Sequence, residues 1–482
     1  MSLVVGIREK EGDSDILICL SRSSPRYPGS SVMVGIAIAP PGPRVSRSDL
    51  VDYGREVRDR LKSQPAIATA LTVAFAASNA TPGSVRFAIE TPRGEDIPWE
   101  AICDDQNQLI GVDRDFRLAR VVETYAPSTR VYDLPLRIAA FMSAAGITAQ
   151  RELDAMLDAI AQSGLKSDTL TADIYLGETG VIEAARARVA QEPLLGGVQI
   201  HTLPPDEAAF AQALEQRPAQ IIHFFCHGRL NASIQALEFA TIAGWQSQGL
   251  DDGELRAPGA EADASVSSNP QDALFLQVNK LPSMLGVKQA WAIVLNCCEG
   301  ATATARVHSM ARNLVADGVP ACLGMAEPIA SSEASLISAA VYSALFKALA
   351  PVFQRPVNAA PLDVDFDGAG VAARLALSGF YGPTSRDYSR WLLPRLYINA
   401  DGLLAQRVSG GADAASKMQI RLQTVADFER NLVNPPQQTL RELVDYLNEA
   451  PAVPDAVRPE RLKSSSDPGP GGAGGVVGGG DG

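Results

Sequence analysis

The stretch Ile221-Ile222-His223-Phe224-Phe225-Cys226-His227-Gly228 is a run of apolar and β-branched residues that ends in a histidine and a glycine. Its length and composition are typical of a buried strand, and the glycine indicates where the strand is expected to end. In an open parallel sheet the carboxyl ends of the strands face the ligand crevice. The stretch therefore predicts a histidine at the functional edge of a sheet.

A second stretch, Ala292-Ile293-Val294-Leu295-Asn296-Cys297-Cys298-Glu299-Gly300, has the same form but ends in two cysteines. If the two strands are neighbours, they deliver an imidazole and a thiol to one edge. A neighbouring imidazole makes a thiol a better nucleophile and later protonates the leaving amine. The pair predicts a cysteine hydrolase with His227 as the base. His223, inside the apolar run and four residues earlier, is expected to be a core histidine on the same strand face.

The sequence decides less firmly between the two adjacent thiols. Cys297 continues the apolar run and fits a small buried hydrophobe, as do Cys226 and Cys322. Cys298 stands at the turn before Glu299-Gly300, where a side chain can point out of the sheet. We therefore predict Cys298 as the nucleophile, with Cys297 as the alternative.

The two stretches resemble the His-Gly and Cys-Glu motifs of the CHAT domain, a caspase-like cysteine protease family in the clan that contains separase. The resemblance implies a His227–Cys298 dyad and an oxyanion hole made by the backbone N–H groups of Gly228 and Cys298. His223, Cys297 and Glu299 are expected to lie around the dyad. The doubled cysteine departs from the family pattern, in which alanine usually precedes the nucleophile.

From about residue 134 strands and helices alternate, which predicts an α/β fold with a mostly parallel sheet and helices on both faces. Together with the two motifs, this rhythm favours a caspase-like three-layer αβα sandwich. We expect four parts: an N-terminal β/α region at 1–134, the protease domain at 135–400, a helical extension at 401–450 and a disordered Pro/Ser/Gly-rich tail at 451–482.

Three local expectations concern the surroundings of these parts. A helix is predicted over residues 48–77 with Ser48 as its N-cap. A helix over 301–316 would follow Cys298 directly, so that its first-turn N–H groups could stabilise a thiolate. The acidic segment 243–271 is read either as a substrate-gating or self-cleavage loop or as a solvated insertion.

Composition limits the partners. The net charge of -13 and the lack of a basic stripe argue against direct nucleic-acid binding. We expect no apolar run long enough to span a membrane and no signal peptide, and therefore a cytoplasmic location. Six cysteines and four histidines without metal-ligand spacing suggest neither a disulfide framework nor a metal site, and no cofactor is expected.

The resemblance implies an endopeptidase that cleaves a partner protein through an acyl-enzyme and is triggered within a bacterial defence or cell-death system. A separate activator or regulatory protein is expected, because no helical-repeat sensor is visible. Two alternatives remain: a catalytically inactive caspase-like interaction or scaffold module, and another cysteine-dependent hydrolase or transpeptidase on a similar sheet. The reaction product distinguishes the enzymes: a cleaved peptide, a released small acyl group or a crosslinked protein.

Overall fold

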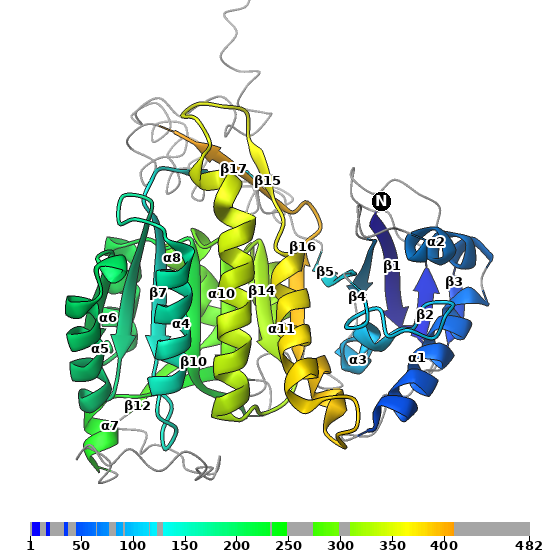
Figure 1. Cartoon of the computed structure of the whole chain (residues 1–482), viewed down its shortest axis with the longest axis horizontal. Coiled ribbons are helices and arrows are strands. Elements are labelled where there is room, and N and C mark those ends of the chain that lie inside the picture. The colour runs from blue at the N-terminus through cyan, green and yellow to red at the C-terminus, as the bar shows by residue number, and fades with distance from the viewer. Residues whose placement is uncertain are drawn as a thin grey trace, which may run out of the picture. The chain divides into compact units, whose positions relative to one another are not determined.

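The computed structural model (Figure 1) describes residues 2–9, 16–19, 33–36, 45–63, 65–76, 83–89, 92–114, 116–122, 129–231, 234–247, 273–297 and 309–408. The chain divides into two compact units, Met1–Asp413 and Ala414–Gly482. All described residues belong to the first unit. The predicted tail, nearly all of the predicted helical extension, and the acidic segment from residue 248 on lie outside the described residues.

One large sheet runs through the first unit. In the described part of the chain it has 14 strands. The order along its main path is β3 (Met33–Ile36), β2 (Ile16–Cys19), β1 (Ser2–Glu9), β4 (Ser84–Ile89), β5 (Arg117–Val122), β16 (Pro394–Asn399), β14 (Ala321–Met325), β13 (Ala292–Cys297), β10 (Ile221–Asn231), β7 (Leu136–Met142), β8 (Leu170–Leu176) and β9 (Val198–Thr202). Two further strands, β11 (Ile234–Ala240) and β12 (Ala273–Gln277), extend from β10.

The six consecutive strands β14, β13, β10, β7, β8 and β9 are parallel to one another. The strand order shows that successive strands are joined by crossovers, and helices lie between them in the sequence. This is the arrangement predicted by the strand–helix rhythm. Strands β7, β13 and β14 read as apolar runs without alternation because they are buried on both faces.

Helices cover both faces of this sheet. One face packs on α4 (Gln150–Ser163), α5 (Thr179–Gln191), α10 (Ser331–Phe353) and α11 (Asp367–Tyr381). The other packs on α6 (Glu207–Gln216), α8 (Leu285–Lys288) and α9 (Met310–Ala316). In Figure 1, α4, α10 and α11 lie in front of the strands. The predicted α/β class, with a mostly parallel central sheet between two helical layers, is confirmed.

The helix predicted over 301–316 begins later. Met310 is the first residue of α9, and the Ser309 side chain caps it by accepting from the Arg312 N–H at 3.2 Å. Cys298 is therefore not in the first turn of α9. The predicted effect of a helix dipole on the Cys298 thiolate stays a prediction, because residues 298–308 lie outside the described residues.

The N-terminal region shares the central sheet with the core. Its strand β5 pairs in parallel with β16, which pairs antiparallel with β14. The helix predicted over 48–77 is two helices, α1 (Arg47–Lys62) and α2 (Pro65–Phe75), because Pro65 starts a new helix. The N-cap of α1 is Ser46 rather than Ser48: its hydroxyl accepts from the Asp49 N–H at 3.3 Å.

A short 3₁₀ helix, Trp99–Ala101, is packed inside this N-terminal region. Trp99 is fully buried, stacks on Phe87 with ring centroids 5.2 Å apart, and donates to the Gly94 carbonyl at 2.8 Å. The next residue, Glu100, forms a bidentate pair with Arg120 of β5, with both N···O distances 2.9 Å. Both side chains are almost completely buried.

Three smaller features complete the described fold. Strands β15 (Leu362–Val364), β17 (Leu403–Arg407) and β6 (Thr129–Tyr132) form a second sheet. Short helices α3 (Pro92–Asp96) and α7 (Ile242–Ser247) precede the 3₁₀ turn and follow β11, respectively.

The 23-residue helix α10 is long and apolar enough to cross a membrane, judged by length and composition alone. The expectation that no run reaches this length was therefore wrong. In the fold, α10 packs on α4 and α11 and buries residues such as Ile337, Val341 and Leu345, which is also the behaviour of a core helix.

We expect the buried Glu100–Arg120 pair to contribute measurably to the free energy of unfolding. Burial by itself raises the pKa of Glu100, but the Arg120 guanidinium outweighs burial and brings the pKa down to about 2. Glu100→Gln leaves Arg120 buried without its counter-charge, so we expect urea unfolding to show a loss of about 3–5 kcal/mol.

The same variant should also change the pH dependence. Because the folded-state pKa of Glu100 is lowered, its contribution is complete above about pH 4.5 and is lost as the pH falls toward 2. That acid-side loss should be smaller in Glu100→Gln. The exposed Glu56→Gln is the control and should change stability by less than about 1 kcal/mol. Equal effects of the two substitutions would contradict this account.

Candidate functional site

The two motif strands, β10 and β13, are parallel neighbours. The register runs from Ile221 opposite Ala292 to Cys226 opposite Cys297. Each strand thus carries its motif to the same carboxyl-terminal edge, and Cys226 and Cys297 form the last β10–β13 pair among the described residues. His227 directly follows Cys226, and Cys298 directly follows Cys297. Cys298 and Glu299 lie outside the described residues.

Strand β10 does not end at His227-Gly228, as the glycine led us to expect. It continues to Asn231 and pairs antiparallel with β11, with His227 opposite Glu238 and Gly228 opposite Leu237. The parallel pairing with β7 ends at Phe225, and the pairing with β11 begins at His227. The sequence signal was therefore a change of partner strand. The free N–H of Gly228 that an oxyanion hole requires stays a prediction.

The His227 ring is held by one backbone group. Its Nε2 lies 2.8 Å from the Ala145 carbonyl oxygen, and the residue is only 3% exposed. Since a carbonyl oxygen can only accept, Nε2 carries a hydrogen and donates it. In the neutral ring Nδ1 then has the lone pair. Burial lowers the pKa of His227, although the Ala145 bond and the nearby Glu238 oppose this effect. In the neutral ring Nδ1 is therefore the nitrogen that is able to accept a proton.

The Ala145 loop is itself supported. Ser143, which follows β7, donates its hydroxyl to the Ala240 carbonyl at 2.6 Å and accepts from Trp245 Nε1 at 3.0 Å. Ala145, Ala240 and Trp245 also form a small apolar cluster. A Cβ at Gly177 would lie 2.2 Å from the Ala240 carbonyl oxygen, so only glycine fits beside this loop. The loop that orients His227 is thus fixed by packing from α7 and β8.

The far end of the same loop is held by a carboxylate. Glu178, just after β8, accepts from the Ala149 N–H at 2.7 Å. Burial raises the pKa of Glu178 to about 7, although the bonds from Ala149 and Thr148 lower it. Sequence reasoning missed Ser143, Trp245 and Glu178. Their one visible signal was the position of Ser143 and Glu178 just beyond the carboxyl ends of β7 and β8.

Cys297 faces away from His223 and Asn296. It is 1% exposed and belongs to the apolar cluster with Cys226 and Cys322, on the sheet face covered by α6 and α9. Burial raises the pKa of the Cys322 thiol in the same cluster, and Cys297 adds to that effect. Cys297 therefore lies in the environment of a core residue.

His223 is completely buried on the opposite face. Its Nε2 lies 3.1 Å from Glu152 Oε1, and its ring centroid is 5.8 Å from that of Tyr342. The contact between His223 Nε2 and Glu152 Oε1 lacks the alignment of a hydrogen bond and is therefore only electrostatic. In the described residues, no group of three or more His, Cys, Asp or Glu side chains could hold a metal ion.

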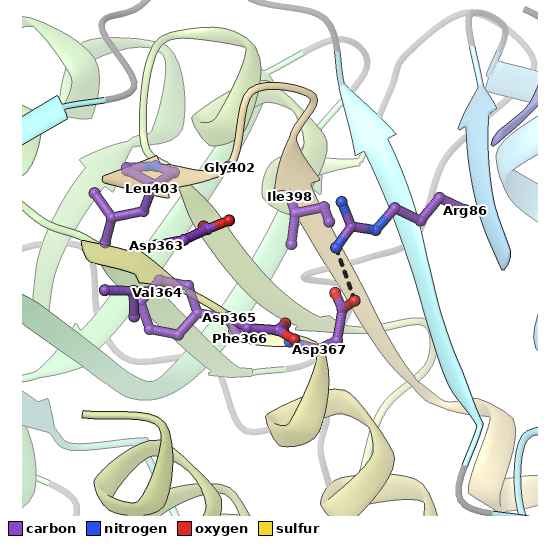
Figure 2. A pocket seen from close by; sticks show the side chains of 10 residues that line it. Arg86, Asp363, Val364, Asp365, Phe366, Asp367, Ile398, Gly402 and Leu403 are labelled. Atoms are coloured by element: carbon purple, nitrogen blue, oxygen red, sulfur yellow. Dashed lines mark hydrogen bonds and ion pairs between the residues drawn. The ribbon is translucent and has the colours of Figure 1, made fainter. Parts of the chain in front are cut away.

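A cavity of about 380 Å³ lies elsewhere in the fold. Pro320, just before β14, lines it, so it is at the amino-terminal end of the parallel strands, opposite to His227. Figure 2 shows Arg86 and Asp367 joined by an ion pair of 2.9 Å at this cavity. Asp365 pairs with Arg117. The cavity contains none of the predicted site residues.

Residues 68–354 match the CHAT domain. The chain belongs to the CHAT domain family. The matched range covers more than half of the 482 residues and includes both motif strands. Membership in this family of caspase-like proteases agrees with the resemblance seen in the two motifs.

No curated protein matches the chain. Among solved structures, the CHAT protein is similar to two crystal structures of the Saccharomyces cerevisiae separase–securin complex, with TM-scores of 0.31 and 0.30 and identities of 10% and 11%. These alignments cover 68% and 67% of this chain but only 16% and 15% of the other. The chain thus spans about one sixth of the length of the separase–securin chains it matches.

The geometry of His227 predicts its tautomer. In ¹⁵N-histidine NMR, the His227 resonances, assigned by their loss in His227→Gln, should show the neutral Nε2–H form at pH 7. Because burial lowers the pKa, protonation should reach half only below about pH 6.5. A neutral ring with hydrogen on Nδ1, or a charged ring at pH 7, would contradict the assignment of Nδ1 as the base.

Proposed function

We propose that this CHAT protein is a cysteine endopeptidase in which His227 and Cys298 form the catalytic dyad. The observation that carries the proposal is the parallel register of β10 and β13, with Cys226 opposite Cys297. Neighbouring strands lie about 4.8 Å apart, and consecutive Cα atoms about 3.8 Å apart. One step beyond the last pair, an extended chain would bring residue 298 beside His227.

The side-chain alternation supports Cys298 over Cys297. Cys297 is directed into the apolar cluster under α6 and α9, whereas Asn296 contacts the opposite helical layer. Along β10, the side chains of residues 223, 225 and 227 point toward that opposite layer. Along β13, those of residues 294 and 296 do the same, and residue 298 would follow if the strand continues. On this reasoning the His227 ring and the Cys298 thiol share a sheet face, while Cys297 does not.

The proposed reaction uses His227 Nδ1 as the proton acceptor. It takes the thiol proton of Cys298, and the thiolate attacks the scissile carbonyl of a peptide bond. The imidazolium then gives its proton to the leaving amine, which forms an acyl-enzyme. Water, deprotonated by the same nitrogen, hydrolyses the thioester. The N–H groups of Gly228 and Cys298 are proposed to stabilise the oxyanion.

The proposed setting follows from the family. We propose a protein substrate, control by a separate regulatory protein, a cytoplasmic location and a role in bacterial defence or cell death. Glu299 would follow the nucleophile without reacting. A scaffold function without catalysis becomes the conclusion if no thiol of the folded protein is activated.

The test is labelling by a panel of peptide acyloxymethyl ketones that differ in the residue next to the reactive group, followed by intact mass and peptide mapping. We expect one adduct, on Cys298, that Cys298→Ala abolishes. Removing the general base in His227→Ala should slow labelling by about 10²–10⁴-fold.

Cys297→Ala is the matched control, because it removes the adjacent thiol while leaving the proposed dyad complete. It should be labelled at the wild-type rate. Labelling that disappears only in Cys297→Ala would move the nucleophile by one residue. An unlabelled wild type, with the variants folded by circular dichroism, would contradict the proposed endopeptidase and favour the scaffold function.

A further inference from the structure

A buried carboxylate lies under the proposed dyad. Glu152 is in the first turn of α4 and is 1% exposed. Its Oε1 accepts from Asn296 Nδ2 at 2.7 Å and from the Ser338 hydroxyl of α10. His223 Nε2 lies 3.1 Å from the same oxygen. One oxygen atom therefore collects contacts from β10, β13 and α10.

The two strand partners occupy related positions in the motifs. His223 is four residues before His227 on β10, and Asn296 is two residues before Cys298 on β13. Even spacing along a strand keeps side chains on one face. Glu152 thus contacts both motif strands on the sheet face where the proposed dyad lies.

The same chain segment also holds the base. Ala145, whose carbonyl accepts from His227, lies five residues before the first residue of α4, and Glu152 lies in the first turn of that helix. Residues 145–152 therefore touch His227 at one end and Asn296 at the other. A shift of this segment would change the two motif strands together.

Stability alone does not account for a carboxylate in this place. Removing a carboxylate from water costs several kcal/mol, and well-packed apolar residues often replace buried charges without loss. Among the described residues, the second oxygen, Oε2, has no hydrogen-bond partner. Asn296 also bonds the Ala334 carbonyl at 3.1 Å and the Ser338 hydroxyl at 3.2 Å, so its amide is fixed in one orientation. This geometry defines the position of β13 two residues before the proposed nucleophile.

We propose that Glu152 is a positioning residue that fixes the cysteine-bearing end of β13 against the histidine-bearing end of β10, through its hydrogen bond from Asn296. The inference rests on the proposed function, since it explains how that dyad is held at its working distance. The acceptor oxygen carries the role, because it is the atom that Asn296 binds. A misplacement of about 1 Å can cost about 10²-fold in rate.

The test distinguishes the effect of the acceptor oxygen of Glu152 from the effects of its charge and of its shape. Glu152→Gln keeps the length and one acceptor oxygen, whereas Glu152→Met keeps similar bulk without an acceptor. We would measure the second-order rate of Cys298 alkylation by iodoacetamide between pH 5 and 9, mapped by peptide mass and expressed per folded molecule.

We expect Glu152→Gln to alkylate within about threefold of wild type. Glu152→Met should react at least about tenfold more slowly at pH 7, with its pH midpoint displaced toward the value of about 8.5 for a free thiol. A purely structural role would lower the melting temperature of both variants without moving the pH midpoint. Asp154→Asn, 43% exposed on the same helix, is the control and should leave the rate unchanged.

Three outcomes would overturn the proposal. Glu152→Met could retain the wild-type midpoint, Glu152→Gln could lose as much rate as Glu152→Met, or the control could match Glu152→Met. If Glu152→Met does not fold, Asn296→Leu replaces it, with the same expected loss and the same contradiction if the midpoint stays. A wild-type midpoint near 8.5 would instead contradict the proposed dyad itself.

Discussion

The parallel pairing of β10 with β13 is the constraint on which the rest of the site depends. Backbone hydrogen bonds fix the register, so a slip by one residue would turn every side chain of β13 to the other face. Cys297 would then leave the apolar cluster, and Asn296 would lose Glu152. Because both faces of the strand are buried, such a slip is costly, and the position of the residue after Cys297 follows from core packing.

The N-terminal region contributes to this core through charge as well as through strands. Arg120 of β5 binds Glu100 and also donates to the carbonyls of Glu95 and Ile97. Glu95 in turn accepts from the Ser309 N–H at 3.1 Å, at the start of α9. The start of α9 is thus held at Ser309 by a carboxylate of the N-terminal region. This contact links a part of the chain outside the central parallel strands to the surroundings of the site.

Much of the fold could be predicted because buried parallel strands have a simple pattern. The strand–helix alternation expected from about residue 134 begins with β7, whose apolar run is buried at every residue but one. The predicted boundaries of two elements, the start of α1 and the end of β10, were wrong. Ser48 was predicted as the cap of α1, but Ser46, two residues earlier, caps it, and Gly228 was read as a strand end although it continues into a hairpin.

The site was less accessible to prediction for a physical reason. Sequence identifies the residue types that can act as base and nucleophile, but the group that orients His227 is the Ala145 backbone carbonyl, which every residue has. Glu152 looked like an ordinary first-turn acid of a helix. Its role depends on Asn296 and His223, which the fold brings to it from 144 and 71 positions away in the sequence.

The most direct test of the register is a disulfide between the two motif strands. In a chain with Cys226→Ala, Cys297→Ala and His227→Cys, mild oxidation should join the thiol introduced at position 227 to Cys298, because neighbouring strand positions have the 4.4–6.8 Å Cα separation, roughly, that a disulfide requires. Peptide mapping should find this bond in the folded protein and not in urea-unfolded chains diluted to the same concentration. No bond, or a bond from position 227 to another cysteine, would contradict the placement of His227 beside Cys298.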